Sequence, residues 1–150
     1  MNREHVLPTP EDTHALGRSL AHVLRAGDLV VLVGPLGAGK TALTQGIGAG
    51  LGVGEPVTSP TFVIARVHRD GRVPLVHVDA YRLGGVADVD DLDLDASAAE
   101  SVTVVEWGQG LVEHLTDEHL EVRLERGDDD VRTALLVPHG PGWAERITAR

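Results

Sequence analysis

The stretch Asp28–Thr41, which reads DLVVLVGPLGAGKT, decides the fold class. Its first half is a short apolar run with β-branched residues, which favours a buried strand over a helix. Its second half, Gly34–Thr41, fits the pattern G-x-x-x-x-G-K-[ST] without a gap. A strand that runs directly into such a loop predicts an α/β domain whose backbone amides bind the phosphates of a nucleotide.

The constant positions of this loop have separate chemical roles. Gly34, Gly37 and Gly39 allow backbone angles that a β-carbon disfavours, so successive N–H groups can face phosphate oxygens. Lys40 brings an ammonium group to the β- and γ-phosphates, and Thr41 offers its hydroxyl to Mg²⁺. We therefore predict that ATP and Mg²⁺ bind here, with the rest of the loop supplied by Pro35, Leu36 and Ala38.

Helix signals lie on both sides of the loop. Thr9 and Asp12 form a capping-box-like pair at the start of an expected helix, which we expect to end at Gly27. The residues Thr41–Leu51 are expected to form the helix after the loop, which adds its positive N-terminal end to the phosphate site. A last helical turn is expected over Trp143–Ile147.

Strand signals complete the predicted fold. The runs Thr61–Val67 and Val73–Asp79 flank an Asp-Gly pair and predict an antiparallel hairpin. The runs Leu120–Leu124 and Val131–Val137 predict a second hairpin, and Ser101–Val105 a further central parallel strand. Together these patterns predict an α/β fold with a P-loop core, a mostly parallel central sheet, antiparallel hairpin strands at the edges and flanking helices.

The bulk composition limits the class of protein. The chain has 150 residues, 42% hydrophobic and 24% charged, so we expect a single domain over residues 1–150. It has no cysteine, which excludes disulfides, thiolate catalysis and cysteine-bound zinc. The opening MNREHVLPTP has no apolar run, and no stretch approaches the roughly 20 apolar residues of a membrane span. We therefore expect a cytosolic protein without a membrane segment.

The charge balance bears on the partners. Thirteen basic and 23 acidic residues give a formal charge of −10. Such a balance disfavours unaided nucleic-acid binding, because that binding depends on neutralisation of phosphates by Lys and Arg. It does not exclude action on nucleic acid within a complex. Residues 86–100 include several acidic and no basic residues. They form either a solvated acidic face or a surface for a basic partner protein.

Two acidic residues are candidates for catalysis and metal binding. A P-loop enzyme needs carboxylates that hold Mg²⁺ and orient the attacking group, at strand ends beside the loop. Asp79 ends one strand-like run and Glu106 follows another. The alternatives are a turn-capping acid for Asp79 and an exposed edge charge for Glu106. His77 and Asp79 alternate along their run, so we expect them to share one face.

Four segments in close succession give the chain a family resemblance: Gly34–Thr41, Thr58-Ser-Pro-Thr-Phe62, His77-Val-Asp-Ala-Tyr-Arg-Leu83 and Val105-Glu-Trp-Gly108. In this order they resemble the TsaE (YjeE-type) family, the ATPase subunit of bacterial tRNA threonylcarbamoyladenosine synthesis. The resemblance spans almost the whole chain. The second and third segments are far more specific to the family than the P-loop is.

The resemblance implies a role for each matching position. Lys40 and Thr41 would be the P-loop lysine and the Mg²⁺-binding threonine, Asp79 the acid needed for hydrolysis and Glu106 a Mg²⁺ ligand. Which of the two acids contacts the metal directly stays open. Further nucleotide contacts would come from Thr61 in a switch-like segment, Trp107 beside the nucleotide, and Gln109 and Arg132. A core position is the alternative for Trp107, and neither Gln109 nor Arg132 lies in a firm motif.

The resemblance also implies partners. Proteins of this family act with the TsaD–TsaB pair, which holds the tRNA and performs the transfer, so contact with tRNA would be indirect. The ATPase would spend hydrolysis on resetting or activating that assembly, and hydrolysis by the isolated protein is expected to be slow.

The sequence disfavours three other nucleotide-binding functions. A small-molecule P-loop kinase usually has an arginine-bearing lid, and the candidate region, residues 84–100, has no arginine. A GTPase is disfavoured because no N-K-x-D segment occurs. A non-hydrolysing nucleotide-sensing module is disfavoured, without being excluded, by the intact Lys40, Thr41, Asp79 and Glu106.

The histidines do not predict a metal enzyme. The chain has eight of them, but no H-E-x-x-H motif occurs. His114 and His119 lie in an acidic, loop-like segment, and we expect them to be solvated.

Overall fold

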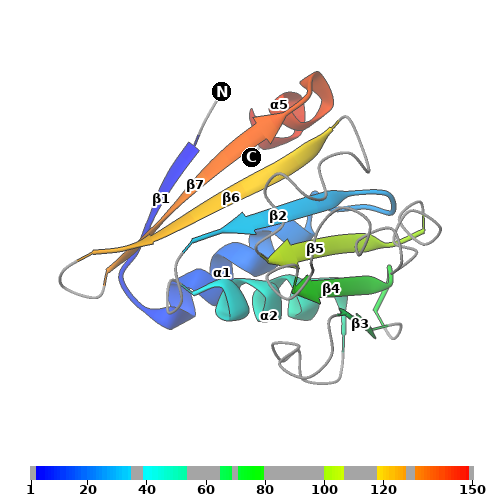
Figure 1. The fold of residues 1–150 in the computed structure, drawn as a ribbon, viewed down its shortest axis with the longest axis horizontal. Coiled ribbons are helices and arrows are strands. Elements are labelled where there is room, and N and C mark those ends of the chain that lie inside the picture. The colour runs from blue at the N-terminus through cyan, green and yellow to red at the C-terminus, as the bar shows by residue number, and fades with distance from the viewer. Residues whose placement is uncertain are drawn as a thin grey trace.

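The computed structural model describes residues 3–34, 39–53, 65–68, 71–79, 100–106, 118–127 and 131–148. Ten helices and strands lie within these ranges (Figure 1), in the order β1 Arg3–Leu7, α1 Pro10–Ala21, β2 Leu29–Val33, α2 Lys40–Leu51, β3 Ala65–His68, β4 Leu75–Asp79, β5 Val102–Glu106, β6 His119–Arg126, β7 Arg132–His139 and α5 Pro141–Thr148.

The strands form one mixed sheet in the order β1-β7-β6-β2-β5-β4-β3. Its centre, β6-β2-β5-β4, is parallel, and the outer pairs β1–β7, β6–β7 and β3–β4 are antiparallel. This arrangement confirms the predicted α/β fold, with a parallel centre and antiparallel hairpin strands outside it; β1 forms the edge beyond the β6–β7 hairpin. The strand predicted over Ser101–Val105 is β5, which lies beside β2 in the middle of the sheet.

The predicted start of the first helix is confirmed. The backbone N–H of Asp12 donates to Oγ1 of Thr9 at 3.3 Å, and that of Thr9 donates to Oδ2 of Asp12 at 3.0 Å. The predicted end at Gly27 is wrong, because α1 ends at Ala21. Two arginines from distant parts of the chain donate to carbonyl groups here: Arg72 to those of Ala21 and Leu24, and Arg146 to that of Val23. Helical periodicity contains no sign of these contacts.

Strand β1 was not predicted. It pairs with β7 at the edge of the sheet, and its Val6 is 60% exposed. An edge strand of this kind is held mainly by backbone hydrogen bonds, so it lacks the apolar alternation by which a strand is recognised in a sequence.

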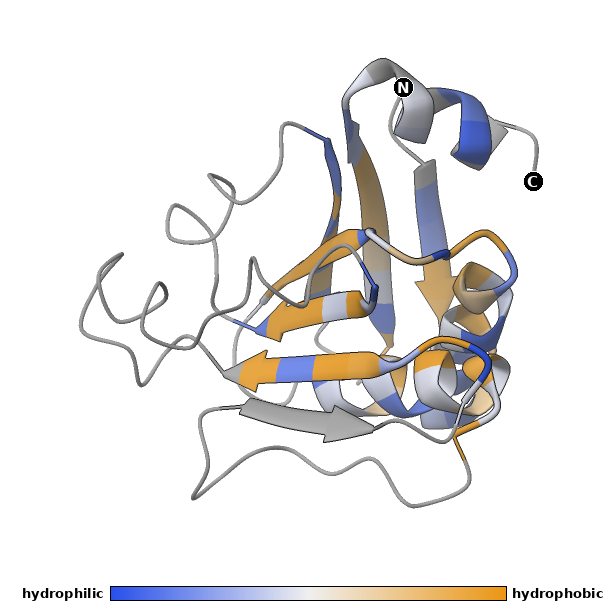
Figure 2. Cartoon of the chain, turned by 90° about the vertical axis from the view of Figure 1, so that its right-hand side faces the viewer, coloured by the Kyte–Doolittle hydropathy of each residue, from blue (hydrophilic) through white to orange (hydrophobic). Residues whose placement is uncertain are grey.

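Helices α1 and α2 pack against each other and cover one face of the sheet (Figure 1). The strand residues beneath them alternate along each strand and include Val30, Leu32 and Val104. Strand β2, in the middle of the sheet, is apolar along its whole length (Figure 2). The helices approach closely where Gly17 faces α2, since a Cβ on Gly17 would lie 2.3 Å from the carbonyl oxygen of Leu43.

The expected C-terminal helical turn is confirmed as α5. Its Trp143 is 2% exposed and belongs to the main core. The guanidinium of Arg146 lies 3.9 Å from the Trp143 ring centroid and pairs with Asp28, just before β2. Among the described residues, no helix is long and apolar enough to cross a membrane.

Candidate functional site

Three parallel strand ends meet at one edge of the sheet. Glu106 lies beside Leu32 of β2 on one side and beside Asp79 of β4 on the other. Strand β2 continues through Val33 to Gly34, where the glycine-rich loop begins. The sheet therefore brings both predicted acidic positions to the edge from which the loop departs, as expected. Only the backbone of Asp79 is described.

The described ends of the loop have the expected backbone. Gly39 has φ +103°, a left-handed conformation that glycine adopts readily, and it is the N-cap of α2. No side chain caps this end, and the first turn has no acidic residue. The first amides of a helix lack partners within the helix. They and the helix dipole therefore make this end suitable for an anion such as a phosphate.

Lys40, the only lysine of the chain, joins the two ends of the loop. Its Nζ donates to the carbonyl oxygen of Gly34 at 2.6 Å, and the residue is 5% exposed. The contact holds the ammonium group at Gly34, the described start of the loop. Thr41 is half-buried in the first turn of α2, beside Lys40.

Glu106 is a buried acid with a buried partner. Its Oε2 lies 2.5 Å from Nε2 of His77, and the two residues are 5% and 0% exposed. An ionised carboxylate only accepts hydrogen bonds, so His77 donates through Nε2 when Glu106 is charged. The alternative of an exposed edge charge is wrong for Glu106. His77 fixes one carboxylate oxygen, and the described residues place no hydrogen-bond partner on the other.

Sequence reasoning did not assign His77 or Thr13 to the site. The signal for His77 was its spacing of two residues from Asp79, which places both on the face that also carries Glu106. Thr13 of α1 is 1% exposed, and a Cβ on Gly39 would lie 3.4 Å from its methyl group. Within the described part of the chain, no group bonds to its hydroxyl. Nothing in the local pattern of α1 places Thr13 beside the loop.

The other predicted site residues lie elsewhere or outside the described residues. Arg132 begins β7, two strands from β2 across β6, and the sheet does not bring it next to Glu106. Its predicted nucleotide contact stays a prediction. The positions outside the described residues are Pro35, Leu36, Gly37, Ala38, Thr61, Trp107 and Gln109, together with most of the acidic stretch 86–100.

The expectation that His119 is solvated is wrong. His119 is the first residue of β6 and is only 6% exposed. Its ring stacks on that of His139 across the β6–β7 pair, a contact that depends on the register of two strands. His114 lies outside the described residues.

Comparisons with known proteins agree on one family. The family model of the threonylcarbamoyl adenosine biosynthesis protein TsaE matches residues 7–134. The tRNA threonylcarbamoyladenosine biosynthesis protein TsaE of Streptomyces coelicolor is 61% identical over 137 residues, which cover 86% of this chain and 92% of that protein. The protein of the same name from Bacillus subtilis is 40% identical over 132 residues, 87% of this chain and 82% of its own length.

A solved structure has the same fold. The crystal structure of Bacillus subtilis YdiB superposes with a TM-score of 0.84 at 32% sequence identity. The match covers 99% of this chain and 93% of the YdiB chain.

Proposed function

The chain belongs to the TsaE family of tRNA threonylcarbamoyladenosine biosynthesis proteins, and we propose that within this pathway it is a Mg²⁺-dependent P-loop ATPase. One observation carries the ATPase proposal. The loop held by Lys40 and the buried carboxylate of Glu106 lie at the ends of adjacent parallel strands. This is the placement that phosphoryl transfer from a nucleotide requires.

The described residues fit ATP. The N-terminal end of α2 and the ammonium group of Lys40 offer positive charge and N–H donors to the phosphates. Lys40 would exchange the carbonyl oxygen of Gly34 for the β- and γ-phosphate oxygens. Because ammonium donors strengthen their contacts as negative charge develops, Lys40 would contribute to stabilising the transition state.

The described residues also fit Mg²⁺. The cation prefers oxygen ligands and commonly takes one or two carboxylates besides substrate phosphates and water. Glu106 offers a buried carboxylate whose orientation is set by His77, and Thr41 offers a hydroxyl one residue after Lys40. Asp79, at the neighbouring strand end, is the second acid. When bound, Mg²⁺ would neutralise charge on the β- and γ-phosphates.

We propose that the partner is the TsaD–TsaB pair and that contact with tRNA is indirect. The formal charge of −10 supports docking on protein in preference to RNA. In this role the protein would work in the cytoplasm, and hydrolysis would reset or activate the transferase between cycles. Hydrolysis by the isolated protein should be slow, because the partner completes the active site.

Reconstitution tests the role in tRNA modification. Threonylcarbamoyl-tRNA would be measured over several turnovers with the partner enzymes and either the wild-type protein, no added protein, or Lys40→Ala. Arg18→Ala, an exposed change on α1, is the matched control. We expect repeated turnover only with the wild type and the control. Equal product in every reaction would refute this role and would direct the search to a kinase acceptor.

A further inference from the structure

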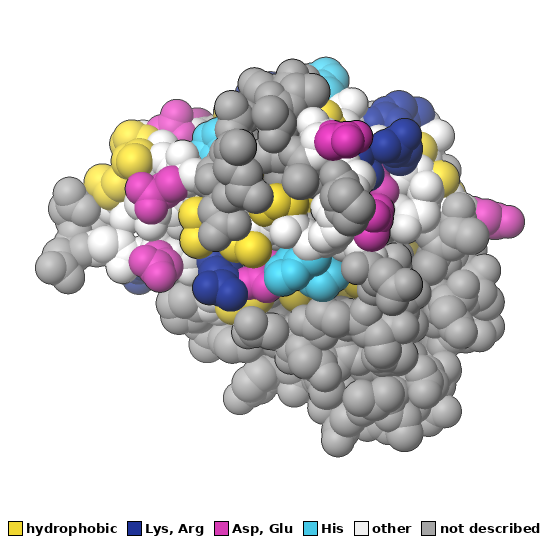
Figure 3. Space-filling model, turned by 90° about the horizontal axis from the view of Figure 1, so that it is seen from above, with side chains coloured by type: hydrophobic (Ala, Val, Ile, Leu, Met, Phe, Trp, Pro, Cys, Tyr) yellow, Lys and Arg dark blue, Asp and Glu magenta, His cyan; other side chains and the backbone are white. Residues whose placement is uncertain are grey.

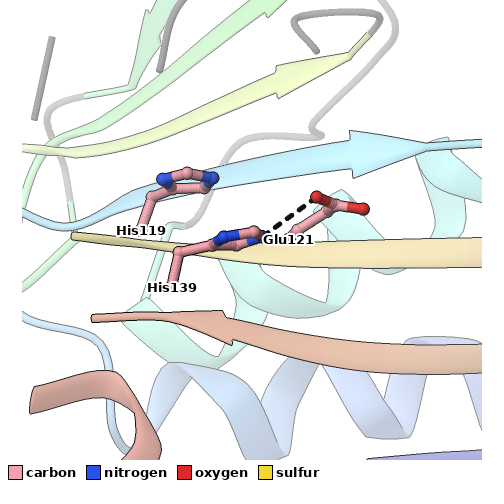
Figure 4. Close-up of side chains that lie close together, drawn as sticks. All are labelled: His119, Glu121 and His139. Atoms are coloured by element: carbon pink, nitrogen blue, oxygen red, sulfur yellow. Dashed lines mark hydrogen bonds and ion pairs between the residues drawn. The ribbon is translucent and has the colours of Figure 1, made fainter. Parts of the chain in front are cut away.

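Three side chains capable of binding metal lie together on the β6–β7 hairpin. His119 and Glu121 are two residues apart on β6, and His139 lies opposite His119 on β7. All three therefore point to the same face of the sheet (Figure 4). This face is opposite to the one covered by α1 and α2, because Leu120 and Val122, which alternate with them, belong to the core beneath the helices.

The potential ligand atoms of the cluster are close together. One nitrogen of each histidine and one carboxylate oxygen of Glu121 all lie within 4.8 Å of one another. The two rings stack with centroids 4.3 Å apart and an interplanar angle of 11°. Nε2 of His139 lies 3.1 Å from Oε1 of Glu121, the contact drawn as a dashed line in Figure 4.

The hydrogen bonds of Glu121 orient its two carboxylate oxygens differently. Arg123 bonds to Oε2, so Oε1 is the oxygen that faces His139. A carboxylate oxygen held beside two imidazoles is a suitable ligand for a divalent cation.

The cluster is accessible from outside. The side chain of His139 is 41% exposed, whereas that of Glu121 is 5% exposed. On the face seen in Figure 3, histidine, acidic and basic side chains lie next to one another beside hydrophobic ones. A cation would therefore reach the two buried ligands past the partly exposed ring of His139.

We propose that His119, Glu121 and His139 bind a divalent transition metal of the zinc class. Two imidazoles and one carboxylate are a ligand set that zinc accepts, with a fourth position for water. At metal–ligand bonds of about 2.1 Å, the ligand atoms of a tetrahedral site lie roughly 3.4 Å apart. The widest spacing in the cluster would have to contract by up to about 1.4 Å, mainly through rotation of His139, and Arg123 would stay on Oε2 outside the ligand shell.

This site is separate from the nucleotide loop. His119 begins β6 and lies level with the start of β2, since Leu120 pairs with Val30. The loop leaves β2 at Gly34, five residues after Leu29, which is roughly 15 Å along the strand. A metal here would join β6 to β7 at the end of the sheet away from Glu106, and its role would be structural.

Zinc binding by the whole protein, free of nucleotide, Mg²⁺ and any histidine tag, tests the proposal. Zn²⁺ would be titrated against a chromophoric chelator, and thermal unfolding would be followed with and without Zn²⁺. We expect one equivalent to bind and to raise the melting temperature. His139→Ala should weaken binding by more than about 100-fold, because even groups outside a ligand shell commonly contribute 10- to 100-fold. Glu121→Gln should also weaken Zn²⁺ binding.

His22→Ala is the matched control, since His22 is an exposed histidine at the end of α1. It should bind Zn²⁺ like the wild type. If a ligand variant does not fold, the X-ray absorption spectrum of the wild-type zinc complex must still show imidazole ligands. Absence of stoichiometric binding, a spectrum without imidazole, or equal affinity in His139→Ala and His22→Ala would overturn the proposal.

Discussion

Nε2 of His77 lies 2.5 Å from Oε2 of Glu106, and this contact joins the middle of β4 to the end of β5 within the buried part of the site. Within the described residues, Nδ1 of His77 has no hydrogen-bond partner, so its ring is oriented chiefly by Glu106 and by packing. His77 is therefore a positioning residue. In the proposed Mg²⁺ site it would act on the metal through Glu106.

The first prediction concerns this positioning role. His77→Ala should raise the Mg²⁺ concentration needed for half-maximal ATP hydrolysis by about 10- to 100-fold, because partners that orient metal ligands commonly contribute this much. His77→Gln, which keeps a donor, should recover part of the loss. The Mg²⁺ dependence of phosphate release is the measurement. If both variants lose stability and keep the wild-type Mg²⁺ dependence, His77 has a packing role only.

The second prediction concerns the contact between α1 and α2. Gly17→Ala should destabilise the protein by about 1–3 kcal/mol, because the new Cβ would lie 2.3 Å from the carbonyl oxygen of Leu43, a backbone atom that cannot rotate away. Helix propensity alone predicts the opposite sign, a gain of up to about 1 kcal/mol. Urea unfolding distinguishes the two signs. Arg18→Ala, exposed on the same helix, should change stability by less than about 0.5 kcal/mol.

The third prediction concerns the start of α1. Thr9→Ala removes the side-chain oxygen that accepts from the backbone N–H of Asp12 and should cost about 1 kcal/mol of unfolding free energy. Glu11→Ala, an exposed change in the same turn, is the comparison. Equal stability of the two variants in thermal unfolding would show that the capping box contributes little.

Much of the fold could be predicted from local patterns. Residues close together in the chain determine the glycine-rich loop, the Thr9–Asp12 capping box and the two hairpins. The structure confirms the capping box, both hairpins and the fold around the loop. Glu106 was also predicted beside the loop, because the carboxyl ends of parallel strands meet at one edge of the sheet.

The features that were missed depend on contacts between distant residues. The end of α1 is bonded by Arg72 and Arg146, which lie far along the chain. The pairing of His77 with Glu106, and of His119 with His139, follows from strand register, which no local pattern contains. Buried histidines therefore resembled solvated ones until the strands were paired.

The most direct test of the proposed ATPase is phosphate release from ATP in the presence of the partner enzymes, with Mg²⁺ or with EDTA. We predict that the wild-type protein releases phosphate only with Mg²⁺. Lys40→Ala and Glu106→Gln should each lower the rate by about 100-fold or more, because each removes charge that stabilises the transition state or its metal. A Lys40→Ala or Glu106→Gln protein as fast as the wild type, or a wild-type rate unaffected by EDTA, would contradict a Mg²⁺–ATP site at the ends of β2 and β5.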